Sequence, residues 1–305
     1  MNNKNSAKTY LKAHENSISV RMDFLLALIP SILWSVIRYK TEALVLIFVS
    51  VGTTVITEFI LNSILNRKIS VPSVYTVYCG VFYALTLYSS TSLLIAASGA
   101  VLIPLLKKML SAKGKCLYFV PLVVREVVFL MLPNQINTPE GMPYESIVKG
   151  IIPNESPLEL ILGMPDGVLG SLSVIAVVIG GIYIVLRKST EFKVSLAYIS
   201  TTILLTFIFP LIEARGAESS LYELLSSEAL FITFFVLTDM PSTPEKKIEK
   251  YLKGILCAVI TFTLTRTDLT INAFFMAIVI SETIMPIFNV GINQLISAKE
   301  RKNAE

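Results

Sequence analysis

Apolar segments of near membrane-spanning length recur along the whole chain, separated by polar connections. A helix crosses the roughly 30 Å hydrocarbon core of a bilayer with about 20 apolar residues at about 1.5 Å each, so these segments predict transmembrane helices. Several are shorter than that, which predicts broken or tilted helices. Ten helices are expected, at about residues 22–37, 43–65, 71–87, 89–106, 117–132, 168–186, 194–211, 221–237, 251–264 and 271–287.

The longest polar stretch lies between the fifth and sixth segments and is rich in Pro, Gly, Asn and Glu. It divides the helices into two groups of five, an arrangement that an inverted repeat would explain, although the two halves share little sequence. We therefore predict an all-α polytopic membrane protein with about ten transmembrane helices in two five-helix halves. The expected organisation is a cytoplasmic N-terminal segment 1–21, a first half 22–132, an extracytoplasmic loop 133–166, a second half 167–290 and a cytoplasmic tail 291–305.

The composition excludes an ordinary soluble domain, because 53% of the 305 residues are hydrophobic and only 16% are charged. The mean hydropathy is +0.69. The net charge of +4 is small and is better explained by membrane topology than by binding to nucleic acid. The three cysteines lack metal-ligand or CxxC spacing, so neither a disulfide framework nor a cysteine-ligated cluster within this chain is expected. The first twenty residues are polar, so no cleavable signal peptide is expected.

Basic residues are distributed between the connections as the positive-inside rule requires. Of the 26 lysines and arginines, twenty fall in segments on the side of the N-terminus, five fall on the other side, and Arg125 lies within an apolar segment. This distribution supports an even number of helices and predicts that both termini are cytoplasmic. It also places the 133–166 loop on the extracytoplasmic side of the membrane.

Several ionisable residues lie within or beside the apolar segments. A charged group at membrane depth costs at least about 2.5–3.5 kcal/mol, so such residues are rare and usually functional. They form either a cation or proton pathway or a set of buried tethers between helices, and both interpretations are open. Sequence neighbours point about 100° apart on a helix, so Arg125 and Glu126 are expected to have separate partners on other helices. The set comprises Glu58, Arg125, Glu126, Glu228 and Glu282 inside segments, with Asp23 and Asp239 near segment ends.

Hydroxyl groups cluster beside two of these acids, Glu58 and Glu282. Hydroxyl and carboxylate oxygens suit a hard cation such as Na⁺, so these clusters indicate possible sodium ligands. The alternative is that each hydroxyl satisfies a backbone carbonyl of its own membrane helix. The hydroxyl residues are Thr53, Thr54, Thr57, Ser281 and Thr283.

The acid Asp239 closes the apolar segment 221–237, directly after Thr238. A carboxylate at the C-terminal end of a helix faces the negative end of the helix dipole, which is unfavourable by up to about 1 kcal/mol. Another interaction should therefore hold it there, as a functional role would require. The alternative is a simple turn, in which Ser242 or Thr243 caps the next helix.

The residues around Asp239 also carry a family resemblance. The run Phe-Val-Leu-Thr-Asp-Met-Pro-Ser-Thr-Pro at 235–244 resembles Phe-Met-Ala-Thr-Asp-Pro-x-Thr-x-Pro, a motif of RnfD, a membrane component of the Rnf electron-transport complex. NqrB, a component of the sodium-pumping NADH:quinone oxidoreductase, shares that motif. The runs at 166–173 and 179–183 look like the family's Gly-x-x-Gly-Glu-x-Ser and Ile-Gly-Gly-Ile-Tyr, and 80–87 and 107–130 are similar to further family stretches. The resemblance therefore runs almost end to end.

The resemblance implies a subunit, in a prokaryotic plasma membrane, that couples electron transfer to Na⁺ or H⁺ movement. Its partners would be other membrane and peripheral subunits: cluster-bearing membrane proteins, an outer flavoprotein and a cytoplasmic NADH or ferredoxin module. Such a chain belongs to an oxidoreductase complex rather than being an enzyme alone, and the single histidine and the absence of nucleophile or phosphate-loop motifs agree with this. The residues expected in the ion pathway are Asp239 and Thr238 at a cytoplasmic gate, then Glu58, Glu126 and Glu282 in the membrane.

The family's flavin site differs in this chain. The family carries FMN through a phosphoester to the threonine of a Ser-Gly-Ala-Thr-Pro-Leu run, and the best register here places Met142 at that position. Methionine has no hydroxyl to esterify, and Thr138, four residues earlier, is only a weak candidate because it lacks the flanking pattern. Ser171 stands where the family has glutamate. Noncovalent FMN or riboflavin is therefore expected rather than covalent FMN. The second hypothesis is a flavin-free transporter, channel or assembly scaffold with the same fold.

Overall fold

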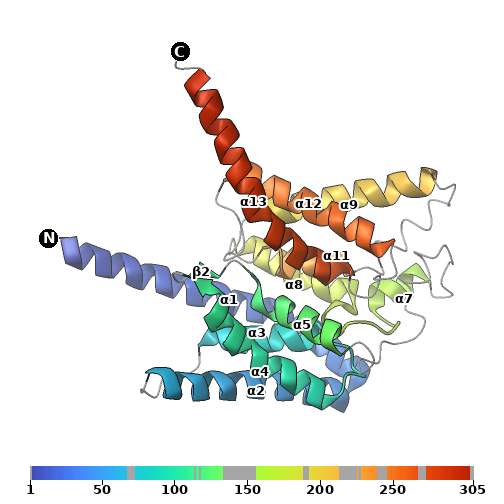
Figure 1. Cartoon of the computed structure of the whole chain (residues 1–305). Coiled ribbons are helices and arrows are strands. Elements are labelled where there is room, and N and C mark those ends of the chain that lie inside the picture. The colour runs from blue at the N-terminus through green and yellow to red at the C-terminus, as the bar shows by residue number, and fades with distance from the viewer. Residues whose placement is uncertain are drawn as a thin grey trace.

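The computed structural model describes residues 2–66, 73–112, 115–116, 118–132, 156–187, 192–212, 225, 228–238, 246–266 and 273–302 (Figure 1). These residues are almost entirely helical. The helices are α1 (Asn2–Tyr39), α2 (Thr41–Asn66), α3 (Val74–Leu85), α4 (Leu93–Leu110), α5 (Val120–Met131), α7 (Pro157–Leu162), α8 (Val174–Leu186), α9 (Lys193–Ile212), α11 (Ala229–Phe235), α12 (Lys247–Thr265) and α13 (Ala273–Lys302). A 3-10 turn, η2 (Leu169–Ser171), and an antiparallel hairpin of β1 (Ser111–Ala112) and β2 (Lys115–Cys116) accompany them.

Each of the ten predicted segments contains a helix, which confirms the all-α membrane class. Within the described ranges, three spans are long and apolar enough to cross a membrane: Ile18–Tyr39, Thr41–Leu65 and Leu93–Leu110. Shorter apolar helices follow the same pattern elsewhere. Several predicted segments yield shorter helices; α5, for example, has 12 residues and α11 has 7. At about 1.5 Å per residue they are about 18 and 10 Å long, well below a bilayer's hydrocarbon thickness.

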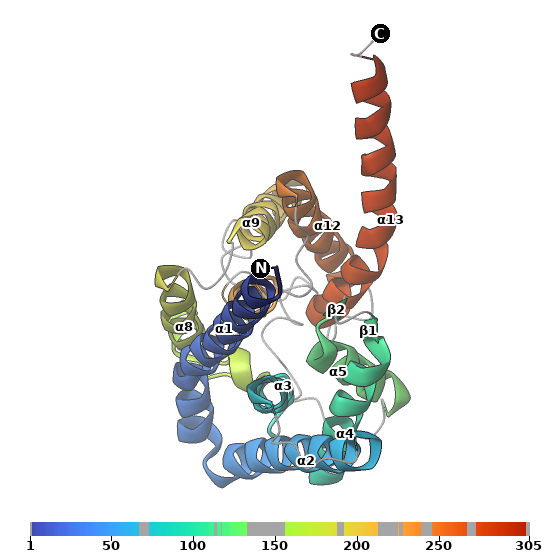
Figure 2. The same ribbon diagram turned by 90° about the vertical axis from the view of Figure 1, so that its left-hand side faces the viewer.

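Two short helices, α3 and α11, are each packed against several neighbouring helices. Helix α3 lies inside an arc formed by α1, α2, α4 and α5, and it packs against all four (Figure 2). Helix α11 packs in a similar way against α8, α9 and α13. The turn η2 contacts both α3 and α11, so the two short helices meet at the same turn.

The two arcs also share a pattern of neighbours. In the first, α2 packs on α4 and α4 packs on α5; in the second, α9 packs on α12 and α12 packs on α13. The arcs touch each other through α1 with α8 and through α5 with α13. An inverted repeat would produce such a correspondence. The two five-helix halves and their division at residues 132 and 167 stay predictions, and residues 133–155 lie outside the described part of the chain.

An aromatic cluster fills the region between α3, α5 and α11. The Phe82 ring lies edge-on to Phe119 with centroids 4.8 Å apart and stacks on Phe231 at 5.3 Å. Tyr78 and Phe235 extend the cluster along α3 and α11. These rings are buried, whereas apolar side chains on the outside are widely exposed, which is the distribution expected of a protein that faces lipid.

Close backbone approach explains the paired glycines of the Ile-Gly-Gly-Ile-Tyr run, which lies in α8. A Cβ atom at Gly180 would overlap the carbonyl oxygen of Ala27 in α1, and one at Gly181 would collide with the Phe234 ring of α11. Only glycine lets the three helices come this near. The run therefore sets the spacing of α8 against α1 and α11.

A short helix occupies the end of the predicted loop 133–166. Helix α7 begins with a reciprocal capping box: Ser156 Oγ accepts the Glu159 N–H, and a Glu159 carboxylate oxygen accepts the Ser156 N–H at 2.7 Å. Gly163 ends it in the left-handed conformation, with φ 79°. The Ser-Pro-x-Glu sequence carries this signal, and the end of the predicted loop is therefore helical.

Candidate functional site

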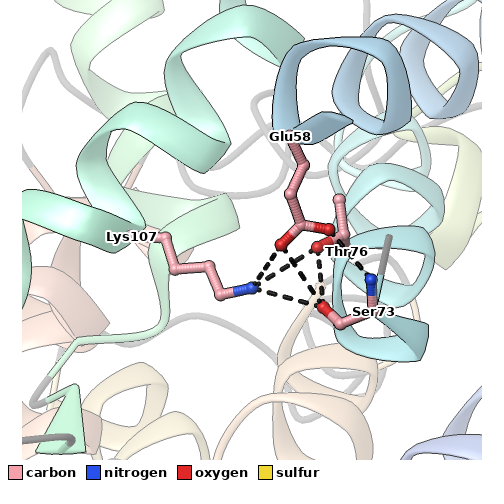
Figure 3. Close-up of polar contacts among 4 residues, drawn as sticks. All are labelled: Glu58, Ser73, Thr76 and Lys107. Carbon is pink, nitrogen blue, oxygen red and sulfur yellow. Dashed lines mark hydrogen bonds and ion pairs between the residues drawn. The ribbon is translucent and has the colours of Figure 1, made fainter. Parts of the chain in front are cut away.

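The predicted pathway acid Glu58 lies in a polar cluster that joins three helices (Figure 3). Its Oε1 accepts a 2.9 Å hydrogen bond from Lys107 Nζ of α4, and its Oε2 accepts the Ser73 N–H, also at 2.9 Å. Ser73 and Thr76, at the start of α3, lie 2.9 Å apart through their hydroxyls, and Lys107 also reaches both of them. Every polar atom of this cluster has a partner. The arrangement ties α2 and α4 to the beginning of α3.

The same lysine approaches an aromatic ring. Lys107 Nζ lies 4.9 Å from the centroid of Tyr75, and the Arg21 guanidinium of α1 lies 4.3 Å from that centroid. Both distances are within the range of cation–π attraction. Helix α1 therefore joins the cluster, and the Lys107 side chain keeps 27% of its surface exposed.

The acid Glu282 of α13 has a more deeply buried partner. Lys253 of α12 lies 3.5 Å from Glu282 Oε1, and each side chain is only 1% exposed. The other carboxylate oxygen accepts the backbone N–H of Phe119, which precedes α5, at 3.2 Å. Glu282 therefore connects α12 and α13 of the second half to α5 of the first half.

Arg125 and Glu126 of α5 pair with each other, so the expectation of separate partners was wrong. Arg125 Nη1 lies 2.6 Å from Glu126 Oε1, although the Cα–Cβ bonds of the two residues point in different directions. Arginine has several rotatable bonds, so its guanidinium can turn back toward the next residue. Its Nε also donates a 3.0 Å hydrogen bond to the carbonyl of Thr86, where α3 ends. A cation there is favoured by the helix dipole.

Aromatic rings enclose the Arg125 guanidinium, whose residue is 0% exposed. Its Cζ lies 4.1 Å from the ring centroids of both Phe129 of α5 and Phe275 of α13. A second acid, Glu228, directly precedes α11 and interacts electrostatically with Arg125 and Glu126. The centre of the bundle therefore holds two acids and one arginine in largely apolar surroundings.

The three charged clusters lie at two depths. Lys107 is in the last turn of α4, just before the β1–β2 hairpin, and Phe119 follows that hairpin, so the Glu58 and Glu282 pairs lie at the same end of the bundle. Arg125 lies six residues beyond Phe119, or about 9 Å farther along α5. The N-terminal end of α1 and the C-terminal end of α13 also project on the hairpin side (Figure 1).

The hydroxyls beside the acids donate to backbone carbonyls, as the alternative to a sodium site predicted. Thr53, Thr54 and Thr57 each bond the carbonyl four residues earlier, at 2.6–2.7 Å. Within α13, Ser281 donates to the carbonyl three residues earlier and Thr283 to the carbonyl four residues earlier, both at 2.8 Å. A hydroxyl that donates its hydrogen to a carbonyl still has lone pairs that could coordinate a cation. Bound Na⁺ therefore stays a prediction. Across the described residues, no cluster of three His, Cys, Asp or Glu side chains is placed to hold a metal ion.

The predicted gate and flavin residues fall mostly outside the described residues. Thr238 is buried, and its Oγ1 donates to the Phe234 carbonyl at 2.5 Å. Asp239, Met142 and Thr138 are not among the described residues, so their roles stay predictions. Ser171 lies in η2 and donates to the Val168 carbonyl at 3.3 Å, a contact local to the turn.

The partner lysines were missed as site residues. Lys107 and Lys253 were counted only as basic residues at the cytoplasmic end, and their charge at a helix end gave no sign of which acid they meet. A further pair joins the two halves: Asp23 of α1 lies 3.1 Å from Arg187, at the end of α8. Tyr183, the tyrosine of the Ile-Gly-Gly-Ile-Tyr run, also donates to Asp23, at 3.4 Å.

Comparisons with known proteins agree with this architecture. The chain is 22% identical over 270 residues to the D subunit of the Na(+)-translocating ferredoxin:NAD(+) oxidoreductase complex of Acetobacterium woodii, covering 84% of this chain and 83% of that protein. It is 25% identical over 239 residues to the D subunit of the ion-translocating oxidoreductase complex of Methanosarcina acetivorans, covering 78% and 76%. The proton-translocating counterpart from Clostridium ljungdahlii is 19% identical over 263 residues, covering 78% and 79%.

The family profile described as "NQR2, RnfD, RnfE family" matches residues 4–296, a range that begins within α1 and ends within α13. The match extends well beyond the motif around Asp239. The chain therefore belongs to the NQR2, RnfD, RnfE family.

Proposed function

We propose that the chain is the membrane subunit of an ion-translocating electron-transport complex of the Rnf type, coupling electron transfer to Na⁺ or H⁺ movement. The observation that carries the proposal is the family match over residues 4–296, together with relatives named as the D subunit of such complexes. The partners would be other membrane and peripheral subunits. The protein would lie in a prokaryotic plasma membrane, with the hairpin end and both termini in the cytoplasm, as the basic residues favour.

The charged clusters suggest how an ion would move through the subunit. Glu58, Glu126 and Glu282 are each paired with a base, so a passing cation must compete with Lys107, Arg125 or Lys253. The 3.5 Å Lys253–Glu282 pair is the longest of the three and connects the two halves through Phe119. Thr238 and Asp239 would form the entrance at the cytoplasmic end.

The experiment is coupled transport by the complex isolated from its native membranes through a tag on this chain. Reconstituted vesicles given reduced ferredoxin and NAD⁺ should take up Na⁺ or H⁺. We expect Asp239→Asn to abolish uptake and leave assembly intact, with the exposed Glu42→Gln as the matched control. Unchanged uptake in Asp239→Asn would reject the gate, and the absence of other subunits from the purified sample would reject the complex.

Bound flavin is part of the proposal, in noncovalent form. Met142 has no hydroxyl for a phosphoester, so FMN or riboflavin would be released on denaturation. Fluorescence and intact mass before and after denaturation measure this directly. A flavin that resists denaturation would contradict the argument from Met142. The lack of any flavin, from a host that flavinylates relatives, would favour the second candidate, a flavin-free transporter, channel or assembly scaffold.

A further inference from the structure

Three buried polar atoms near Arg125 have no hydrogen-bond partner in the part of the chain that the structure describes. They are Tyr83 OH of α3, Glu126 Oε2 of α5 and Glu228 Oε2 before α11. Tyr83 and both acids interact electrostatically with Arg125. Buried polar atoms are nearly always hydrogen-bonded, because leaving one unpaired costs free energy. Their grouping around one guanidinium therefore points to a shared function.

The formal charges of this cluster do not balance among the described residues. Arg125 offers one positive charge, and Glu126 and Glu228 offer two negative charges. Phe129 and Phe275 cover the guanidinium, so the surroundings screen the excess charge poorly. An uncompensated carboxylate at membrane depth is strongly unfavourable, and among the described residues the cluster lacks one positive charge.

A proton meets this need better than a metal ion. Na⁺ takes several oxygen ligands, and here Glu126 Oε1 and the Thr86 carbonyl already accept hydrogen bonds from Arg125. A proton needs only one carboxylate oxygen, and Glu126 Oε2 and Glu228 Oε2 are both available. The facing groups from each element are Tyr83 of α3, Arg125 and Glu126 of α5, Glu228 before α11, and the uncharged Phe275 ring of α13.

We propose that Arg125, Glu126 and Glu228 form a buried proton-binding site that holds one proton for two carboxyl groups at neutral pH. The Glu58 and Glu282 pairs differ, because each acid there has its own lysine. The inference goes beyond the proposed function, since it concerns the isolated subunit and needs neither flavin nor electron transfer.

The test is infrared spectroscopy of the full-length chain in lipid nanodiscs at pH 7, with ¹³C-labelled glutamate to identify glutamic acid bands. We expect a protonated carboxyl band in the wild type and its loss in Glu228→Gln. Glu126→Gln should lose it too, because Arg125 then balances Glu228 alone. The matched control, Glu282→Gln, removes a buried acid that already has a one-to-one partner, so the band should persist.

Several outcomes would overturn the proposal. A wild-type chain without a protonated glutamic acid band at pH 7 would do so without any variant, which covers the case of a variant that fails to fold. Retention of the band in Glu126→Gln would show that burial alone protonates Glu228, and not the shared charge. Loss of the band on adding Na⁺ at constant pH would show a cation site. Failure of coupled transport with an intact band would reject the proposed function and leave this inference standing.

Discussion

The Glu58 cluster and the Arg125 cluster both place acids inside the bundle, yet the charges of these acids are balanced in different ways. Glu58 has one lysine, a backbone N–H and two nearby hydroxyls, and Lys107 is still partly open to the surroundings. Arg125 is fully buried, pairs directly with Glu126, and interacts electrostatically with a second acid, Glu228. In the Glu58 cluster both carboxylate oxygens have partners, whereas Glu126 Oε2 and Glu228 Oε2 near Arg125 have none among the described residues.

Position in the fold reinforces the difference. The Glu58 cluster lies at the hairpin end, where α2, α3 and α4 meet. The Arg125 cluster lies where α3 ends and α11 begins, so its groups come from both arcs of helices. A relative movement of the two arcs would change the distances between the charged groups of the Arg125 cluster. The Glu58 cluster lies within one arc, so its contacts depend only on the spacing of α2, α3 and α4. Substitutions in the two clusters should therefore differ in their effects.

The largest effect is expected from removing the central arginine. Arg125→Met leaves the buried Glu126 and the partly buried Glu228 without their arginine and should lower the free energy of unfolding by about 3–5 kcal/mol. Unfolding in mixed detergent and SDS micelles measures this change. Adding Glu126→Gln to Arg125→Met should recover much of the loss. If Arg125→Met is as stable as the wild type, the cluster does not depend on its cation.

The Lys253–Glu282 pair should show a smaller net effect than the central arginine. Lys253→Met alone leaves a buried carboxylate without its base, which costs about 3 kcal/mol for a buried pair. Glu282→Gln still offers an oxygen to the Phe119 N–H, so the double variant should be close to wild type. The double-variant cycle in the same unfolding assay gives the coupling. Additive losses would show that the two side chains do not interact.

The positions of the membrane helices could be predicted from the sequence, because apolar length alone indicates a membrane segment. Helix α7 was not predicted, although Ser-Pro-x-Glu carries the signal for its cap. The contacts of the acids could not. Lys107 lies 49 residues from Glu58 along the chain, and only the packing of α4 on α2 brings them together. The Arg125–Glu126 pair depends on a side-chain rotamer that helix geometry does not determine. Glu228 was recognised as an acid inside an apolar segment, but its relation to Arg125 requires the position of α11.

The Glu58–Lys107 pair should contribute less than either buried pair. Because about a quarter of the Lys107 side chain is exposed, Lys107→Met should cost only about 1 kcal/mol, and part of that loss is the contact with Tyr75. The effect should shrink in high salt, as expected for a partly solvated ion pair. A loss as large as that of Lys253→Met, or one independent of salt, would mean that Glu58 lies in an environment as closed as that of Glu282.

The smallest effect is expected from the hydroxyls beside Glu58. Thr57→Val has nearly the same shape and removes only a bond to the Thr53 carbonyl, which keeps its place in the helix, so stability should change by less than about 0.5 kcal/mol. If the hydroxyls serve only the backbone, melting temperatures in NaCl and in KCl should shift equally for Thr57→Val and the wild type. Ser63→Ala is the matched control, because Ser63 makes the same bond near the end of α2. A stabilisation by Na⁺ that disappears in Thr57→Val alone would instead identify a sodium ligand. The Glu58 cluster would then also bind a ligand, and the two clusters would differ in which ligand they bind, Na⁺ or a proton.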